Sequence, residues 1–186
     1  VRQDPNIIMV GEIRDRETAS ISVNAAMTGH LLLSTLHTTD AATTLPRLLD
    51  MGIEPFLIAS TVNLIIGQRL VRRLCEACRI AAPLSEEERL ALSSNLSEEM
   101  LNRTETFWRP NGCEVCSHTG YTKRVGIYEI LEVTEALRGL IMRRANADDA
   151  ANAAKKEGMK TMLEDGFLKA AQGITSIAEI IRVIND

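Results

Sequence analysis

Four cysteines stand in two matched pairs, and in each pair two residues separate the members. The pairs are Cys75 with Cys78 and Cys113 with Cys116. Because one tight turn presents two thiolates across such a gap, two pairs can supply the four soft ligands of a tetrahedral zinc ion. Four protein ligands leave zinc no open coordination position, so the pattern predicts a structural zinc site rather than a catalytic one.

Other interpretations of the cysteines are open. Two disulfides or four free thiols use the same residues, although no secretion signal is present and a reducing compartment disfavours disulfides. A redox-active pair needs one C-x-x-C motif, whereas this sequence has two. His118 follows Cys116 by two residues and is a substitute ligand in one interpretation, or a surface histidine of a loop in the simpler one.

An acidic residue follows a short apolar run near the start of the sequence. The run 6–10 leads into Gly11, Glu12 and Arg14. In open α/β sheets, ligands bind beyond the carboxyl ends of the strands, where a carboxylate can hold the waters of a magnesium ion or orient an attacking water. Gly11 would let the backbone approach such a ligand closely. An exposed loop carboxylate without a function is the commoner explanation of a strand followed by glutamate.

Two histidines flank the next apolar run. His37 follows the run 31–36, and His30 precedes it. If the two runs are neighbouring strands, His37 and Glu12 lie at one edge of the sheet, where the imidazole could contact the terminal phosphate of a nucleotide. Seven residues separate the histidines, which places them on opposite faces of an ideal strand, so one site need not hold both.

The order of the elements predicts an α/β fold. The runs 6–10 and 31–36 have the composition of strands buried in a parallel sheet, and 16–28 has helical spacing, with Gly29 placed to end the helix. A strand, a helix and a strand in this order predict a right-handed crossover.

The segment 38–51 is expected to be helical, and Pro46 either kinks this helix or lies in the first turn of one that begins at Thr44. A long buried helix is expected to begin at Glu54 or Pro55 and reach about Leu74, since the middle of this segment is apolar on nearly all sides; its end, 68–73, is basic on one side.

The cysteines bound an insert, 75–122, with an expected helix that begins at Ser85. A strand is expected over 125–133, and helices over 134–186. In the last helix, Ser176 and Glu179 form the pattern of a capping box ahead of an apolar stripe.

The composition is that of a globular protein. Hydrophobic residues make up 45% and charged residues 25%, which excludes a disordered, collagen-like or coiled-coil chain. The net charge of −4 and the aromatic content of 3% disfavour nucleic-acid binding, so no nucleic-acid partner is expected. The longest apolar stretch, 56–66, contains polar residues and is too short to cross a bilayer. The first residue is valine, and the chain has the character of the carboxy-terminal part of a longer protein.

Taken together, these motifs resemble the ATPases of type II secretion and type IV pilus assembly. The matching segments are 7–15 and 17–19 (the Walker B region), 28–31 and 34–38 (the His box), 51–53, 68–70, the two cysteine pairs, 120–121 and 125–129. The resemblance implies the carboxy-terminal half of a RecA-like P-loop ATPase domain with a tetracysteine zinc subdomain and a helical tail. The expected division is a partial ATPase core in 1–74, a zinc-binding insert in 75–122, and a strand plus helices in 123–186.

The resemblance also implies a function. It implies a homohexamer that hydrolyses ATP with Mg²⁺, binds Zn²⁺ structurally, and lies at the cytoplasmic face of the bacterial inner membrane. There it would act on a membrane platform protein that adds subunits to a pilus or pseudopilus. The implied roles are magnesium and water binding for Glu12, phosphate sensing for His37, a place near the nucleotide or subunit boundary for His30, and nucleotide or intersubunit contacts for Gly11, Arg14 and Arg69. The four cysteines would bind the zinc.

The sequence departs from the family pattern in places. It contains no G-x-x-x-x-G-K-[ST] motif and no upstream acidic motif, so the isolated chain is expected to hydrolyse ATP negligibly. Lys123 stands where the family has a glycine. Two other functions are weighed. Arginines near the first cysteine pair suggest a zinc-bearing nucleic-acid motor or binding module, and the zinc subdomain and tail alone would suit a non-enzymatic adaptor.

Overall fold

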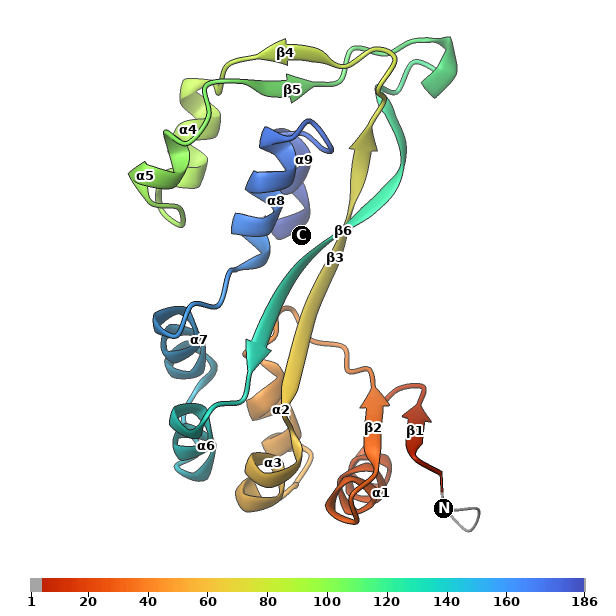
Figure 1. Ribbon diagram of the computed structural model, residues 1–186, viewed down its shortest axis with the longest axis vertical. Coiled ribbons are helices and arrows are strands. Elements are labelled where there is room, and N and C mark those ends of the chain that lie inside the picture. The colour runs from red at the N-terminus through yellow and green to blue at the C-terminus, as the bar shows by residue number, and fades with distance from the viewer. Residues whose placement is uncertain (1–4, 186) are drawn as a thin grey trace. The chain divides into compact units, whose positions relative to one another are not determined.

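The computed structural model describes residues 5–185, which form two compact units. Unit 1 comprises residues 5–67 and Ile130–Met159, and unit 2 comprises Gln68–Glu129 and the residues from Lys160 onward. The strands β3 (Leu64–Leu74) and β6 (Tyr121–Glu132) pair with each other and contribute residues to both units (Figure 1). Among the described helices, none has the length and apolar character needed to cross a membrane.

The expected order of a strand, a helix and a strand is confirmed, whereas the expected burial of both strands is not, because one face of the pair is exposed. Strand β1 (Ile7–Val10), helix α1 (Arg16–Met27) and strand β2 (Leu31–Ser34) follow in order, and β1 pairs with β2 in parallel. Helix α1 begins after Asp15, whose carboxylate accepts the backbone N–H of Thr18 at 2.8 Å. Such a cap satisfies a donor that has no partner inside the helix.

The next segment resolves one open alternative. Helix α2 (Thr44–Asp50) begins at Thr44, so Pro46 lies in its first turn, where a proline costs no hydrogen bond.

The prediction of one long helix from residue 54 to about Leu74 is wrong. Helix α3 (Pro55–Thr61) ends after seven residues, and β3 begins at Leu64. Burial along β3 alternates, with Ile65 buried and Ile66 exposed, which is the period of a strand. A continuous apolar run is compatible with a buried helix or a strand, and only the β-branched residues in it favoured the strand.

Unit 1 is completed by helices α6 (Glu135–Met142) and α7 (Ala147–Lys156). Its core is aliphatic, and its fully or almost fully buried side chains include Ile13, Ala19, Leu45, Leu48, Ile53, Ile58, Leu131 and Leu137. Each buried leucine or isoleucine contributes about 1.5–3 kcal/mol, and this core holds the loops after β1 and β2 in place.

Unit 2 contains the cysteine-bounded insert and the last two helices. Its remaining elements are β4 (Ile80–Ala82), α4 (Glu86–Ser93), α5 (Glu98–Leu101), β5 (Phe107–Arg109), η1 (Glu114–Cys116), α8 (Met162–Ala171) and α9 (Ile177–Asn185). The expected helix start at Ser85 is confirmed by a capping box with Glu88. Phe107 and Phe167 meet edge to face at 5.2 Å between ring centroids, which joins the insert to α8.

The division expected from the sequence, into 1–74, 75–122 and 123–186, stays a prediction. The compact units group residues by packing, and each unit contains segments from more than one of those three ranges.

Glu179 anchors α9 to β3. Its backbone N–H donates to Ser176, as the capping pattern predicts, at 3.2 Å. Its carboxylate is fully buried and accepts the backbone N–H of Arg72 at 3.0 Å and the guanidinium of Arg72 at 2.7 Å. Arg182 donates to the same carboxylate. This side chain therefore joins two segments that lie far apart in the sequence.

One face of the β1–β2 pair is apolar and exposed. The side chains of this face are Ile7, Met9, Leu31 and Leu33. The register places Ile7 beside Leu31 and Met9 beside Leu33, so the four make one continuous patch. Within the described chain, each of the two strands has only the other as a partner.

Lys123 has a backbone φ of 60°, the left-handed region that favours glycine. We expect Lys123→Gly to raise the free energy of unfolding by about 0.5–1 kcal/mol, because it relieves the Cβ strain and loses only part of that gain to chain entropy. Chemical denaturation followed by the fluorescence of Trp108 measures this. Arg124→Gly, at an ordinary φ, should lower stability; an equal loss in both variants would contradict the argument.

Candidate functional site

The strand-end cluster, Glu12, Arg14 and His37, lies beyond the carboxyl ends of β1 and β2. The strands are parallel, so both ends reach the same edge of the sheet. Backbone and side-chain contacts tie the two loops together after the strands end. The N–H of Ile13 donates to the carbonyl of Thr35 at 2.9 Å, and the Thr35 hydroxyl donates to the carbonyl of Gly11 at 2.8 Å.

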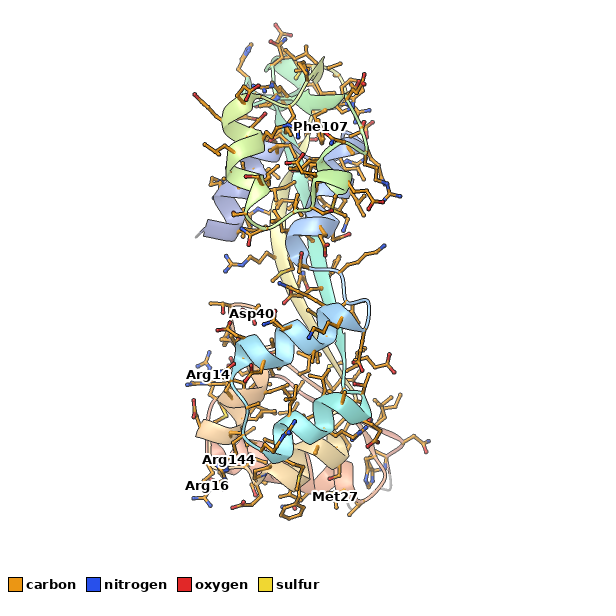
Figure 2. The ribbon with its side chains drawn as sticks, turned by 90° about the vertical axis from the view of Figure 1, so that its left-hand side faces the viewer. Arg14, Arg16, Met27, Asp40, Phe107 and Arg144 are labelled. Atoms are coloured by element: carbon orange, nitrogen blue, oxygen red, sulfur yellow. The ribbon has the colours of Figure 1, made fainter. Side chains whose placement is uncertain are left out.

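One carboxylate oxygen of Glu12 accepts hydrogen bonds from two side chains. Its Oε2 atom lies 2.8 Å from Nε of Arg14 and 3.0 Å from Nε2 of His37. The predicted juxtaposition of Glu12 and His37 is thus present. An ionised carboxylate only accepts hydrogen bonds, so Nε2 of His37 carries the proton in this contact. The side chains of Arg14 and His37 are 71% and 78% exposed, so both can reach a ligand. In Figure 2, Arg14 extends outward from unit 1.

The charge of Glu12 is secured by these contacts. The hydrogen bond from Arg14, followed by that from His37, lowers the pKa of the Glu12 carboxyl below its ordinary value. Glu12 is therefore ionised at neutral pH, as magnesium binding or water orientation requires.

Gly11 leaves free space beside Glu12. A Cβ atom at this position would meet no atom within 4 Å. The backbone is therefore open to a ligand on that side, as expected from the sequence.

An open pocket of about 430 Å³ adjoins His37. Its lining residues are His37, Thr38, Thr39, Thr43, Pro46, Arg47 and Asp50. The turn that leads into α2 is fixed by Asp40, whose Oδ1 accepts the backbone N–H of Thr43 at 2.8 Å. Figure 2 labels Asp40 on unit 1. The pocket places polar side chains of α2 next to the strand-end cluster.

His30 is not part of the strand-end cluster. It precedes β2, whereas His37 follows it, so the two imidazoles lie at opposite ends of the strand. Nδ1 of His30 lies 2.9 Å from the hydroxyl of Thr28 and 3.2 Å from the carbonyl of Ala25. These contacts fix the ring against the end of α1.

Arg69 belongs to unit 2. Its Nη1 donates to the carbonyl of Val183 at 2.6 Å, so the side chain is engaged with α9.

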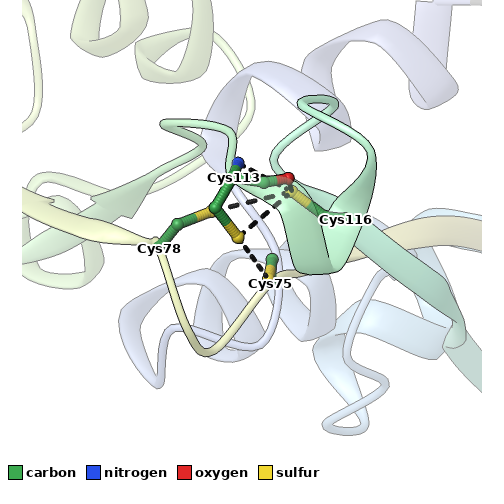
Figure 3. A group of neighbouring side chains, drawn as sticks. All are labelled: Cys75, Cys78, Cys113 and Cys116. Carbon is green, nitrogen blue, oxygen red and sulfur yellow. Dashed lines mark hydrogen bonds between the residues drawn. The ribbon is translucent and has the colours of Figure 1, made fainter.

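The tetracysteine cluster, Cys75, Cys78, Cys113 and Cys116, brings all four sulfurs together (Figure 3). The Sγ atoms lie within 4.8 Å of one another, and the shorter separations are 3.7, 3.8 and 3.9 Å. A zinc ion with four Zn–S bonds of about 2.3 Å needs sulfurs about 3.8 Å apart. All four cysteines are free rather than disulfide-bonded. The arrangement is compatible with a tetrathiolate metal site.

Backbone N–H groups support the second cysteine pair. Burial raises the pKa of the Cys116 thiol, but N–H donors of Cys113 and Gly120, each 3.2 Å from the sulfur, outweigh it and lower the pKa to about 6. Burial raises the pKa of Cys78 to about 11. Hydrogen bonds to a sulfur atom hold that sulfur in the orientation it needs to bind a metal.

Glycine is required in the turn beside this cluster. Gly112 has a φ of +93°, and a Cβ there would lie 2.7 Å from the carbonyl oxygen of His118. His118 itself is exposed and is not one of the residues grouped around the four sulfurs. The simpler interpretation of this histidine therefore fits the structure.

Two features escaped the sequence analysis. Arg47 and Asp50 line the pocket beside His37. Their spacing of three residues on α2 could have predicted that both lie on the same face of the helix. The buried carboxylate of Glu179 gave no signal beyond its capping pattern, because its partner Arg72 lies 107 residues away.

The chain belongs to the type II/IV secretion system protein family, whose model matches residues 1–182. It is 48% identical over 186 residues to the type IV pilus assembly ATPase PilB of Pseudomonas aeruginosa, covering all of this chain and 32% of that protein. It is 45% identical over 186 residues to type II secretion system protein E of Aeromonas hydrophila, covering all of this chain and 36% of that protein. The chain thus spans about a third of the length of these relatives.

Solved structures agree on the fold. The Legionella pneumophila ATPase DotB is 26% identical with a TM-score of 0.60, covering 96% of this chain and 38% of DotB. The pilus retraction motor PilT with bound ADP has a TM-score of 0.63 over 97% of this chain and 40% of PilT, and at 24% identity it supports the fold alone. The α/β fold is therefore that of secretion ATPases.

Proposed function

We propose that this chain is part of an ATPase that couples ATP hydrolysis to type II secretion or type IV pilus assembly. The observation that carries the proposal is the contact of Glu12 with His37 at the shared carboxyl edge of two parallel strands. Relatives at 45–48% identity are named as a secretion protein and a pilus assembly ATPase, which supports the same conclusion.

The residues of the strand-end cluster have distinct roles in this proposal. The carboxylate of Glu12 holds water ligands of Mg²⁺ and orients the attacking water. A magnesium ion supplies charge neutralisation on the transferred phosphate. His37 contacts the terminal phosphate, and Arg14 keeps Glu12 ionised and oriented. Gly11 leaves room for the ligand.

The wider setting of the proposal follows the family. The protein acts as a homohexamer at the cytoplasmic face of the inner membrane and moves a platform protein that adds filament subunits. His30 lies at a subunit boundary or near the nucleotide. Arg69 donates to the carbonyl of Val183 in α9, and its nucleotide or intersubunit contact stays a prediction.

The nucleic-acid alternative gains no support from the arginines that suggested it. Arg72 is bound to Glu179, Arg73 to Glu76, and Arg79 donates to the carbonyl of Gly173. Arg79 also stacks on Trp108 at 4.6 Å from the ring centroid. These contacts engage the three guanidinium groups within unit 2.

Phosphate release tests the proposed function. We expect the purified full-length protein to release phosphate from ATP in the presence of Mg²⁺, and the 186-residue chain alone to release almost none, because it has no P-loop motif. A colorimetric phosphate assay on both proteins measures this. A full-length protein without ATP hydrolysis would contradict the proposed function, and turnover by the short chain near about 10 per second would contradict the requirement for the rest of the protein.

We also propose that the tetracysteine cluster binds one structural zinc ion. The separations between the sulfurs support it, since they match those of a tetrahedral site. We expect about one zinc per chain by elemental analysis of freshly reduced protein. Cys113→Ser should lose the metal and expose the insert to proteolysis while unit 1 stays folded.

Glu114→Gln is the matched control for this zinc prediction. Glu114 is exposed in the same turn and contributes no sulfur, so this variant should keep its zinc. Full metal content in Cys113→Ser, or none in the parent protein, would contradict the assignment.

A further inference from the structure

Arg47 has a free guanidinium in the pocket beside His37. Within residues 5–185, no hydrogen bond or ion pair engages this guanidinium, and the residue is exposed. The other arginine near the strand ends, Arg14, is already bound to Glu12. A cation that lines a pocket without a protein partner is available to an anionic ligand.

The remaining polar groups of the pocket are mostly engaged. The Thr38 hydroxyl contacts Thr44 at 3.1 Å, the Thr39 hydroxyl donates to Asp40, and the Thr43 hydroxyl donates to the carbonyl of Asp40 at 3.0 Å. These hydroxyls hold the pocket wall in place. Of the charged or titratable side chains that line the pocket, Arg47 and Asp50 have no hydrogen bond or ion pair within residues 5–185, whereas His37 is bound to Glu12.

The position of Arg47 on α2 is well defined. Arg47 and Asp50 are three residues apart on one helix face, and Leu45 and Leu48 on the other side are buried in the core of unit 1. The buried leucines fix the rotation of the helix, which directs Arg47 toward the pocket. The guanidinium is thus held near the edge where α/β sheets bind ligands.

Guanidinium groups match phosphoryl oxygens in geometry. Two parallel N–H donors can bind two oxygens of one phosphate, and such charge-assisted hydrogen bonds are about twice as strong as neutral ones. His37 lies on the wall of the same pocket, where its Nε2 already donates to Glu12. Asp50 opposes an anion, so its charge should weaken binding slightly.

We propose that Arg47 is a nucleotide-binding residue, whose guanidinium contacts phosphoryl oxygens of a nucleoside triphosphate in the pocket beside His37. This inference rests on the proposed function, since it assigns the ligand to the ATP that the protein hydrolyses. It deepens that function by adding a cation from α2 to the strand-end cluster.

Equilibrium binding of ATP, ADP and inorganic phosphate to the full-length protein tests the proposal. Arg47→Ala should weaken ATP binding by roughly 10- to 100-fold, the loss typical of a hydrogen bond to a charged group. Arg47→Lys should recover part of the affinity, because it keeps the charge but loses the paired donors. Asp50→Asn should tighten ATP binding about two- to threefold by removing a like charge.

Arg143→Ala is the matched control. It removes the same charge from an exposed position of unit 1 that does not line the pocket, where Arg143 only donates to the carbonyl of Gly139. Its ATP affinity should equal that of the parent protein. Thermal unfolding should be unchanged in all of these variants, since every replaced side chain is exposed.

The outcomes are distinct. If the parent protein hydrolyses ATP and Arg47→Ala binds ATP as tightly as the parent, the inference is wrong and the proposed function stands. If Arg47→Ala loses affinity for inorganic phosphate but not for ATP, the pocket binds a free anion and the nucleotide assignment is overturned. If the parent neither binds nor hydrolyses ATP, both the proposed function and the inference fail.

Discussion

Glu12→Gln in the full-length protein should lower the rate of ATP hydrolysis by roughly 100- to 10,000-fold, the contribution typical of a general acid or base. The amide keeps the size of the carboxylate but cannot carry the negative charge that holds magnesium-bound water and orients the nucleophile. Arg14 and His37 both contact Oε2 of Glu12 and hold this carboxylate in place. The substitution removes the negative charge from that position.

The fold should tolerate this replacement. Glu12 lies at the surface, with 35% of its side chain exposed, and contributes nothing to the aliphatic core. Surface ion pairs contribute little to stability, so the melting temperature should stay close to that of the parent.

Glu17→Gln is the matched control for Glu12→Gln. Glu17 is an exposed carboxylate in the first turn of α1, five residues further along the chain, and should leave the rate unchanged. A steady-state phosphate assay at saturating ATP measures both variants. Retention of more than a tenth of the parental rate by Glu12→Gln would show that Glu12 does not carry the hydrolysis step.

Glu179→Ala should destabilise unit 2 by about 1–3 kcal/mol, the usual cost of leaving a hydrogen-bond donor without its acceptor. The carboxylate is fully buried and accepts the backbone N–H and guanidinium of Arg72 as well as Arg182. Its removal leaves these donors without their acceptor and detaches α9 from β3. Chemical denaturation followed by the fluorescence of Trp108, the single tryptophan, reports on this unit.

The same carboxylate should make unit 2 sensitive to acid. Burial raises the pKa of Glu179, but the hydrogen bonds from Arg182 and Arg72 outweigh it and lower the pKa from 4.5 to about 2. A depressed pKa in the folded state adds stability that is fully present above about pH 4.5 and is lost as the pH falls toward 2. The shift corresponds to about 3 kcal/mol.

Two variants distinguish the acid dependence caused by Glu179 from that of exposed carboxylates in general. Glu179→Ala should lose the part of the acid dependence that this carboxyl contributes, whereas Glu87→Ala, at an exposed position of α4, should keep it. Identical denaturation midpoints for Glu179→Ala and the parent protein at pH 7 would show that the network adds no stability.

The strand-end cluster could be predicted from the sequence because its causes are local. Two short apolar runs with a helix between them define parallel neighbours, and the first polar residues after each run, Glu12 and His37, must then share an edge. The cysteine spacing likewise placed four sulfurs together, since each pair is closed by one turn.

The parts that escaped prediction depend on contacts between distant segments. The middle of residues 54–74 is apolar on nearly all sides, which predicted a helix. Pairing of β3 with β6, about 60 positions later, makes a strand of the second half of this range instead. The contact of Glu179 with Arg72 and the free guanidinium of Arg47 likewise depend on tertiary packing, which no periodicity in a short window reveals.

The bare apolar face of the β1–β2 pair has a consequence for the behaviour of the isolated chain in solution. Ile7, Met9, Leu31 and Leu33 form an exposed patch on a sheet in which, among the described residues, each of the two strands is paired on one side only. Such a surface promotes aggregation, because strands of other molecules can pair with the sheet edges and apolar side chains can associate with the patch. Concentrated solutions of the 186-residue chain should therefore aggregate and become turbid. Charged substitutions on this face should reduce that aggregation.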